Sequence, residues 1–266
     1  MENVVVTALI ATFGTWLMTA LGAATVIFMK NTNQKAMNLM LGFAAGVMIA
    51  ASFWSLLQPA IERAERDLCF PAWAVATLGF LCGALFMWLS DKIVTRARRR
   101  AIAPDGGKSE KFNRIILLVL SITLHNIPEG LAVGVAFGAL CKGFTTDALM
   151  GAITIAVGIA LQNFPEGAAV AFPLRREGYS RRRSFFIGQA SGMVEPIAGV
   201  VGALAVVYIE TILPFALAFA AGTMILVAVH ELIPECQENK KEQPYLATMG
   251  IILGFALMML LDVALG

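Results

Sequence analysis

Long apolar stretches alternate with short polar segments along the whole chain. Each stretch is close to the roughly 20 apolar residues that an α-helix needs to cross a lipid bilayer. We therefore expect an all-α integral membrane protein with eight transmembrane helices. The predicted spans lie near residues 4–29, 36–58, 70–90, 115–141, 147–173, 185–208, 212–234 and 245–265.

Composition supports this assignment, because 58% of the residues are hydrophobic and only 14% are charged. A soluble domain with this composition would expose far more apolar surface than water tolerates. The opening segment MENVVV has neither a basic leader nor a small-residue cleavage site, so we expect the first stretch to remain as a span. The four scattered cysteines form no C-x-x-C pair and predict neither a disulfide framework nor a thiolate metal cluster.

Basic residues are sorted to one side of the predicted bundle. With eight spans, all but three of the 20 Lys and Arg residues fall in the loops after spans 1, 3, 5 and 7. Cytoplasmic loops of membrane proteins carry such an excess. We therefore expect these loops, including a basic loop at 91–114, in the cytoplasm and both termini outside. Because topology accounts for the distribution of the basic residues, the net charge of +2 gives no reason to expect a nucleic-acid partner.

Two short segments in different spans are nearly identical. FAAGVMI occupies residues 43–49 and FAAGTMI residues 219–225, in spans that the topology runs in opposite directions. This match predicts that helices 1–3 (4–90) are repeated, inverted in the membrane, in helices 6–8 (185–265). Inverted repeats are typical of secondary transporters with alternating access. A chance match among small apolar residues is the alternative interpretation.

A longer internal match joins helices 4 and 5, which we expect at 115–173. LHNIPEGLAV at 124–133 and LQNFPEGAAV at 161–170 agree at seven of ten positions, including Asn, Pro, Glu and Gly in register. Glycines spaced four residues apart also predict close helix packing. These are Gly42 and Gly46, then Gly130, Gly134 and Gly138, and finally Gly188 and Gly192.

Ionisable and amide side chains recur inside the predicted spans, where an unpaired charge costs several kcal/mol. Residues three and four apart share one face of a helix. The first motif therefore groups His125, Asn126 and Glu129, and the second groups Gln162, Asn163 and Glu166. Each glutamate is shared between two partners, so paired helices could hold two adjacent metal ions bridged by carboxylates. Glu195, next to Pro196 in the sixth span, is a further ligand candidate.

Two other positions have competing interpretations. His230 and Glu231 in the segment HELIPE, with Glu235, fit either a metal exit site or a capped, snorkelling helix end. Met48 fits a soft metal ligand, although packing is the commoner role of a methionine in an apolar helix. For the central residues the alternative is a hydrogen-bond network that only joins helices 4 and 5. Converging glutamates disfavour that alternative, because like charges repel strongly in a low dielectric.

The donor set of imidazole, carboxylate and carboxamide favours Zn²⁺, Cd²⁺, Fe²⁺ and Mn²⁺ over Cu⁺. We expect a transporter of such ions rather than an enzyme, with the metal as its cargo and no catalytic cofactor. One alternative is a proton- or sodium-coupled carrier of another solute that uses the same carboxylates. Another is an intramembrane metalloenzyme, but Pro234 stands where the H-E-x-x-H motif needs its second His.

At these motifs the chain resembles the ZIP (Zrt- and Irt-like protein) family of divalent-metal transporters, in its bacterial GufA-type branch. The resemblance rests on HNIPEG in a fourth span, a second PEG in the fifth and Glu-Pro in the sixth. It extends over the whole chain, as a single transporter domain at 1–266.

The resemblance implies a 3+2+3 helix bundle that imports metal across the bacterial inner membrane and in which spans 4 and 5 slide against a scaffold. It implies that His125, Glu129, Gln162 and Glu166 form a first metal position. Asn126, Asn163 and Glu195 join the shared glutamates at a second. Two departures are evident, since many members have His where this chain has Gln162 and carry a His-rich loop after span 3. The expected partners are divalent metal ions and the lipid bilayer, and a homodimer is left open.

Overall fold

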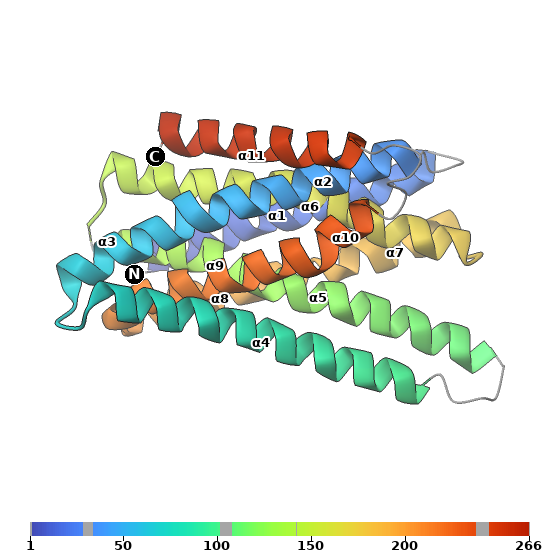
Figure 1. Ribbon diagram of the computed structural model, residues 1–266, viewed down its shortest axis with the longest axis horizontal. Helices are drawn as coiled ribbons and strands as arrows, with labels where there is room; N and C mark the ends of the chain where they lie inside the picture. Colours follow the sequence, from blue (N-terminus) through green and yellow to red (C-terminus); the bar gives the residue numbers. More distant parts are fainter. Residues whose placement is uncertain (1, 29–33, 102–107, 142, 238–244, 266) are drawn as a thin grey trace.

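The computed structural model describes residues 2–28, 34–101, 108–141, 143–237 and 245–265. Within these ranges, the side chains of residues 2, 97–101, 108–122 and 210 lie outside the description. The described part of the chain is an all-helical bundle without a β-strand, drawn in Figure 1. Helix α1 begins and helix α11 ends at the same end of the bundle, as an even number of crossings requires.

Within the described ranges, eight helical segments are long and apolar enough to cross a membrane, and they overlap the eight predicted spans. The prediction of an all-α membrane protein is therefore confirmed. Four of these spans are built from more than one helical element. The elements are α1 (Glu2–Phe28), α2 (Gln34–Ala51), η1 (Ser52–Leu57), α3 (Gln58–Asp67), α4 (Ala72–Ala101), α5 (Lys108–Gly138), η2 (Ala139–Cys141), α6 (Thr146–Arg176), α7 (Arg181–Ser191), α8 (Val194–Tyr208), η3 (Glu210–Ile212), α9 (Leu213–Val227), η4 (Ala228–Leu232), α10 (Ile233–Cys236) and α11 (Leu246–Leu265).

The segment predicted as a basic loop at 91–114 is largely helical, which corrects that prediction. Helix α4 continues to Ala101 and helix α5 already begins at Lys108. Alanine, arginine and lysine have high helix propensities, so a helix can continue after its apolar span has ended. Residues 102–107 lie outside the described residues.

The pairing of the helices has the symmetry of an inverted repeat. The four most extensive helix contacts are α2 with α11, α4 with α9, α1 with α6, and α5 with α8. Exchanging spans 1–3 with spans 6–8, and span 4 with span 5, converts the first pair into the second and the third into the fourth. Both internal sequence matches therefore have a structural counterpart.

The matching heptapeptides contribute glycines at these contacts. A Cβ on Gly46 would lie 2.0 Å from the carbonyl oxygen of Ile251, and one on Gly222 would lie 2.0 Å from that of Phe80. The expected close packing is confirmed at every predicted glycine. A Cβ on any of them would lie about 3 Å or less from a neighbouring helix: α11 for Gly42 and Gly46, α8 for Gly130, Gly134 and Gly138, and α1 for Gly188 and Gly192.

Spans 2 and 7 share a further feature that the sequence analysis missed. Each contains a π-helical segment, η1 or η4, and the two segments begin at equivalent positions of the repeat. Each segment ends two residues before a proline, Pro59 or Pro234. Proline lacks the backbone N–H that an α-helix requires, so a local change of hydrogen-bond register is favoured just before it. The π segment η4 carries His230 and Glu231.

The prolines of the two matching motifs do not interrupt their helices. Helices α5 and α6 remain α-helical through Pro128 and Pro165. The sixth span is the one that breaks, between Ser191 and Val194, where α7 gives way to α8. This break sets Glu195 in the first turn of α8, in the interior of the bundle.

Candidate metal centre

All seven residues predicted to bind metal are buried in the structure. They come from three helices that pack together: α5, α6 and the start of α8. The spacing within each motif turns its side chains to one face of its helix, as predicted. The residues are His125, Asn126 and Glu129 on α5, Gln162, Asn163 and Glu166 on α6, and Glu195 on α8.

Hydrogen bonds from amide side chains link these helices. Gln162 Nε2 on α6 donates to Glu129 Oε1 on α5 at 2.7 Å. Asn163 Nδ2 donates to Glu195 Oε2 on α8 at 2.8 Å. Asn126 Nδ2 donates to the backbone carbonyl of Ser191 at 2.8 Å, just before the α7–α8 break. The structure thus brings the two motifs and the sixth span together.

Five oxygens in this cluster are buried and accept no hydrogen bond. An unsatisfied buried polar atom costs roughly 1–3 kcal/mol, so five in one place need an explanation. They are chemically alike, since carboxylate and carboxamide oxygens are suitable ligands for divalent cations. The five atoms are Asn126 Oδ1, Glu129 Oε2, Gln162 Oε1, Asn163 Oδ1 and Glu166 Oε1.

Amides are essential to this arrangement. Among the described residues, no group of three or more His, Cys, Asp or Glu side chains is arranged to hold a metal ion by itself. The cluster fits a cation only when Asn and Gln oxygens contribute. Cysteine plays no part, because all four cysteines are free and none belongs to the cluster.

His125 extends the cluster toward the seventh span. Its Nε2 lies 2.8 Å from Oε1 of Glu231, in the π segment η4. The neighbouring His230 is exposed and turns to Asp91 on α4, with 3.8 Å between Nε2 and Oδ2. The structure therefore separates this predicted pair, because only Glu231 reaches the central residues. Met48 is buried in the apolar core.

Helix α1 contributes two residues that the sequence analysis did not single out. The hydroxyls of Thr15 and Thr19 donate to Glu195 Oε2 and Oε1, at 2.5 and 3.3 Å. Both threonines are almost completely buried. Their spacing of four residues places them on one face of a mostly apolar helix, which was a readable sign of a polar face turned inward.

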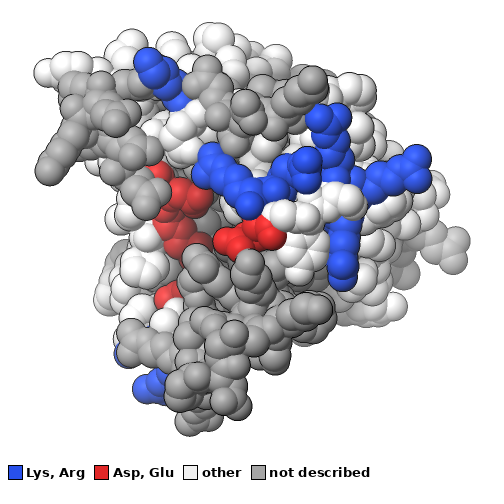
Figure 2. Space-filling view, turned by 90° about the vertical axis from the view of Figure 1, so that its right-hand side faces the viewer, with Lys and Arg blue, Asp and Glu red and all other residues white. Residues whose placement is uncertain are grey.

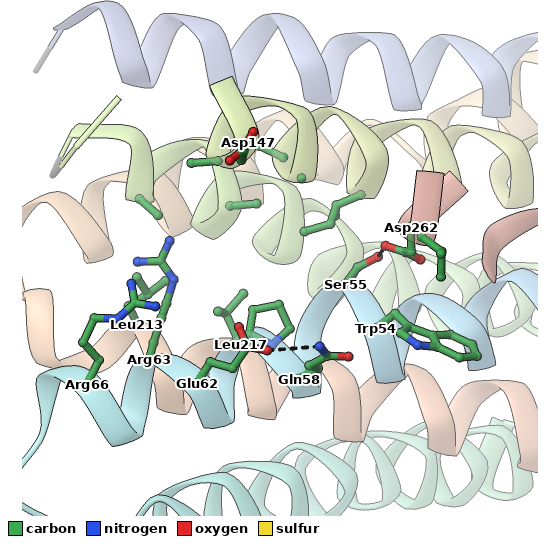
Figure 3. A pocket seen from close by; sticks show the side chains of 18 residues that line it. Trp54, Ser55, Gln58, Glu62, Arg63, Arg66, Asp147, Leu213, Leu217 and Asp262 are labelled. Atoms are coloured by element: carbon green, nitrogen blue, oxygen red, sulfur yellow. Dashed lines mark hydrogen bonds between the residues drawn. The ribbon is translucent and has the colours of Figure 1, made fainter. Parts of the chain in front are cut away.

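A cavity of about 600 Å³ opens at one end of the bundle, where spans 2 and 8 end and spans 5 and 7 begin. Figure 3 shows three acidic side chains around it: Glu62, Asp147 and Asp262. Ser55 Oγ donates to Asp262 Oδ1, and Asp262 Oδ2 is buried without a hydrogen-bond partner. Arg63 and Arg66 also line the cavity, so three carboxylates and two guanidinium groups surround it on the side of the bundle away from the basic loops.

The opposite end is rich in basic side chains, as the space-filling view in Figure 2 shows. Arg175 and Arg176 end helix α6, and Arg181, Arg182 and Arg183 begin helix α7. Acidic side chains lie beside them on this face. The predicted sorting of charge along the bundle axis is therefore visible in three dimensions.

Comparison with known proteins agrees with this architecture. The family model described as ZIP zinc transporter matches residues 3–113 and 107–262. The chain is 41% identical to zinc transporter ZIP11 of Homo sapiens, with 97% of each chain covered. It is 36% identical to zinc transporter GufA of Myxococcus xanthus, over 93% of this chain and 94% of the relative. It is 39% identical to zinc transporter ZIPB of Bordetella bronchiseptica, over 93% and 78%. With a transporter family model matched along nearly its whole length and relatives of this similarity, the chain belongs to the ZIP zinc transporter family.

Proposed function

We propose that this protein carries divalent transition-metal ions, Zn²⁺ foremost, across a membrane into the cytoplasm through the centre between α5, α6 and α8. The observation that carries the proposal is a set of five buried oxygens without hydrogen-bond partners. They belong to Asn126, Glu129, Gln162, Asn163 and Glu166 on α5 and α6. A divalent cation satisfies several such oxygens at once, whereas a purely structural network would leave them unpaired. The three relatives compared above are named as zinc transporters.

The donor atoms support two adjacent ion positions. His125 and Gln162, with Glu129 and Glu166, supply one nitrogen and several oxygens for the first position. Asn126, Asn163 and Glu195 supply the second, with the same two glutamates bridging both. This mixed set of nitrogen and oxygen ligands suits Zn²⁺ and Cd²⁺, and also Fe²⁺ and Mn²⁺. The ion is cargo, and no catalytic cofactor takes part.

Charge gives the path a direction. The basic end of the bundle faces the cytoplasm under the positive-inside rule, which puts both termini and the cavity outside. Glu62, Asp147 and Asp262 offer carboxylates to cations that enter the cavity, beside Arg63 and Arg66, and the central glutamates receive these cations. Helix α5 starts at the basic end, so His125 and its neighbour Glu231 lie on the cytoplasmic side of Glu129. We assign Glu231, with His230 and Asp91 farther out, to the release path into the cytoplasm.

Alternating access follows from the repeat. In an inverted repeat, each half can adopt the conformation of the other, which closes one end of the pathway and opens the other. Here the open cavity is lined by span 2, whereas the equivalent part of span 7 contacts His125 through Glu231. Residue Ser55 in the cavity and Glu231 at the release side occupy equivalent positions of the repeat.

We expect the protein to reside in the bacterial inner membrane.

Metal flux tests this function directly. Purified protein in liposomes is expected to admit Zn²⁺ and Cd²⁺ to a trapped fluorescent indicator, at a rate above that of protein-free liposomes. A proton- or sodium-coupled carrier of another solute would leave the indicator unchanged and respond instead to its own gradient. An intramembrane metalloenzyme would bind zinc without moving it. Zinc entry no faster than in protein-free liposomes contradicts the proposal.

A further inference from the structure

Glu195 differs from the other two central glutamates in how completely its carboxyl group is bonded. Glu129 and Glu166 each keep one buried oxygen without a hydrogen-bond partner. Glu195 is fully buried, yet both of its oxygens are engaged. Oε2 accepts from Thr15 and Asn163, and Oε1 accepts from Thr19. Three donors thus surround this one side chain.

Two of the three donors come from α1, a helix that carries none of the predicted metal ligands. Thr15 and Thr19 lie one turn apart on the face of α1 that packs against α6 and α8. A Cβ on Gly192 would lie 3.0 Å from both Glu195 Oε1 and Thr19 Oγ1. The glycine at the α7–α8 break therefore leaves the space in which the hydroxyl and the carboxylate meet.

Helix α1 also orients the amide of Asn163. Asn163 Nδ2 donates to the backbone carbonyl of Thr15 at 3.2 Å as well as to Glu195. Because its nitrogen is held on that side, Oδ1 is directed away from α1 and remains without a hydrogen-bond partner. A carboxamide ligates a metal through its oxygen, so this orientation is the one that ion binding requires.

We infer that Thr15 and Thr19 are positioning residues that fix Glu195, and with it Asn163, in the geometry of the second ion position. This inference rests on the proposed metal centre and adds α1 to it as its supporting element. Outer hydrogen-bond partners hold the ligands of metal sites in place, and their loss typically lowers metal affinity 10- to 100-fold. The hydroxyls hold the carboxylate against α1 before an ion arrives, so the ligand does not have to be ordered when the ion binds.

The chain offers a matched control on the same helix. Thr12 is also completely buried on α1, and its hydroxyl donates to the carbonyls of Ala8 and Leu9 in its own helix. The Thr15 hydroxyl, in contrast, reaches Glu195 as well as the Thr12 carbonyl of its own helix. Its methyl group would be the nearest neighbour of a Cβ on Gly199, so it contacts α8 through packing alone. Replacement of Thr12 by valine therefore removes a buried hydroxyl of the same kind and leaves Glu195 untouched.

The test compares the variant carrying Thr15→Val and Thr19→Val with Thr12→Val and with wild type. The measurements are Cd²⁺ binding to the full-length purified protein by titration calorimetry, and the KM and kcat of zinc flux in liposomes. We expect the double valine variant to bind one of two Cd²⁺ ions about tenfold more weakly or worse, with a raised KM. Thr12→Val is expected to match wild type, and the Thr15→Ser and Thr19→Ser pair, which keeps both hydroxyls, is expected to restore binding.

Epistasis with Glu195 separates positioning from general packing. In a Glu195→Gln background, Thr15→Val and Thr19→Val are expected to weaken Cd²⁺ binding little further, because the effects of mutations at interacting residues are not additive. The inference is overturned if the double valine variant binds Cd²⁺ like Thr12→Val, or if the serine pair fails to restore binding. Wild-type protein that neither binds Cd²⁺ nor moves zinc would instead overturn the proposed function itself.

Discussion

Zinc uptake by liposomes containing this protein is expected to fall to the rate of protein-free liposomes when Glu129 or Glu166 is replaced by alanine. Each glutamate is buried, keeps one oxygen without a hydrogen-bond partner and is shared between both proposed ion positions. Removing either one therefore takes ligands from two ions at once. Loss of a carboxylate ligand also leaves the incoming dication in a low dielectric without its compensating charge, which costs several kcal/mol. Initial rates with a trapped zinc indicator measure the effect.

Glu65 provides the control for this prediction. It is exposed on α3 and belongs neither to the centre nor to the cavity lining. Glu65→Ala changes the net charge by the same amount and is expected to leave the zinc flux unchanged. Glu129→Gln and Glu166→Gln keep a ligating oxygen but lose the charge, so their flux should lie below that of wild type. Normal flux in both alanine variants would show that ions do not pass through this cluster.

Replacing Gly222 by valine is expected to prevent the bundle from assembling, or to destabilise it by at least about 3 kcal/mol. A Cβ at this position would meet the backbone of Phe80 on α4 at 2.0 Å, and backbone cannot rotate away as a side chain can. Gly46 has the equivalent contact with Ile251 on α11, so Gly46→Val should have a similar effect. The measurements are thermal unfolding in detergent and the yield of monodisperse protein.

The comparison for these variants is Gly14→Val. A Cβ on Gly14 in α1 would find no atom within 4 Å, so this substitution adds the same side chain without a clash. It is expected to preserve both the yield and the unfolding temperature. If Gly222→Val were as stable as Gly14→Val, the close contact between α4 and α9 could not be part of the folded protein.

Much of the fold was predictable because the bilayer imposes simple constraints on the sequence. Apolar length determines where helices cross, and the sorting of Lys and Arg indicates how they are oriented. The grouping of His125, Asn126 and Glu129 on one face followed from helical periodicity alone. The close contact at Gly46 was also predicted, since close helix packing in a membrane depends on small residues.

The features that could not be predicted depend on contacts between distant parts of the chain. Pro128 and Pro165 lie within continuous α-helices. The interruption lies instead between Ser191 and Val194, and the changes in helical register precede Pro59 and Pro234. Sequence alone does not say which prolines the surrounding helices can accommodate. The pair His230 and Glu231 was predicted as a unit, but the local geometry of η4 turns Glu231 to His125 and His230 to Asp91. Thr15 and Thr19 gain their role only because Glu195 lies opposite them.

The repeat also shows where the two halves have diverged. His125 and Gln162 are equivalent positions, and so are Glu231 and Ser55. His125 lies beside Glu231, whereas Gln162 donates to Glu129 and Ser55 donates to Asp262 at the cavity. A symmetric backbone therefore carries different polar side chains toward its two ends. Under the proposed function, this difference distinguishes the side of uptake from the side of release.

Anomalous diffraction at the zinc absorption edge, from crystals of the protein grown with Zn²⁺, tests the central claim most directly. The account predicts zinc between α5 and α6, with oxygens of Glu129 and Glu166 at the usual Zn–O distance of about 2.0–2.2 Å. It is contradicted if these glutamates contact only protein groups while the zinc in the crystal lies elsewhere.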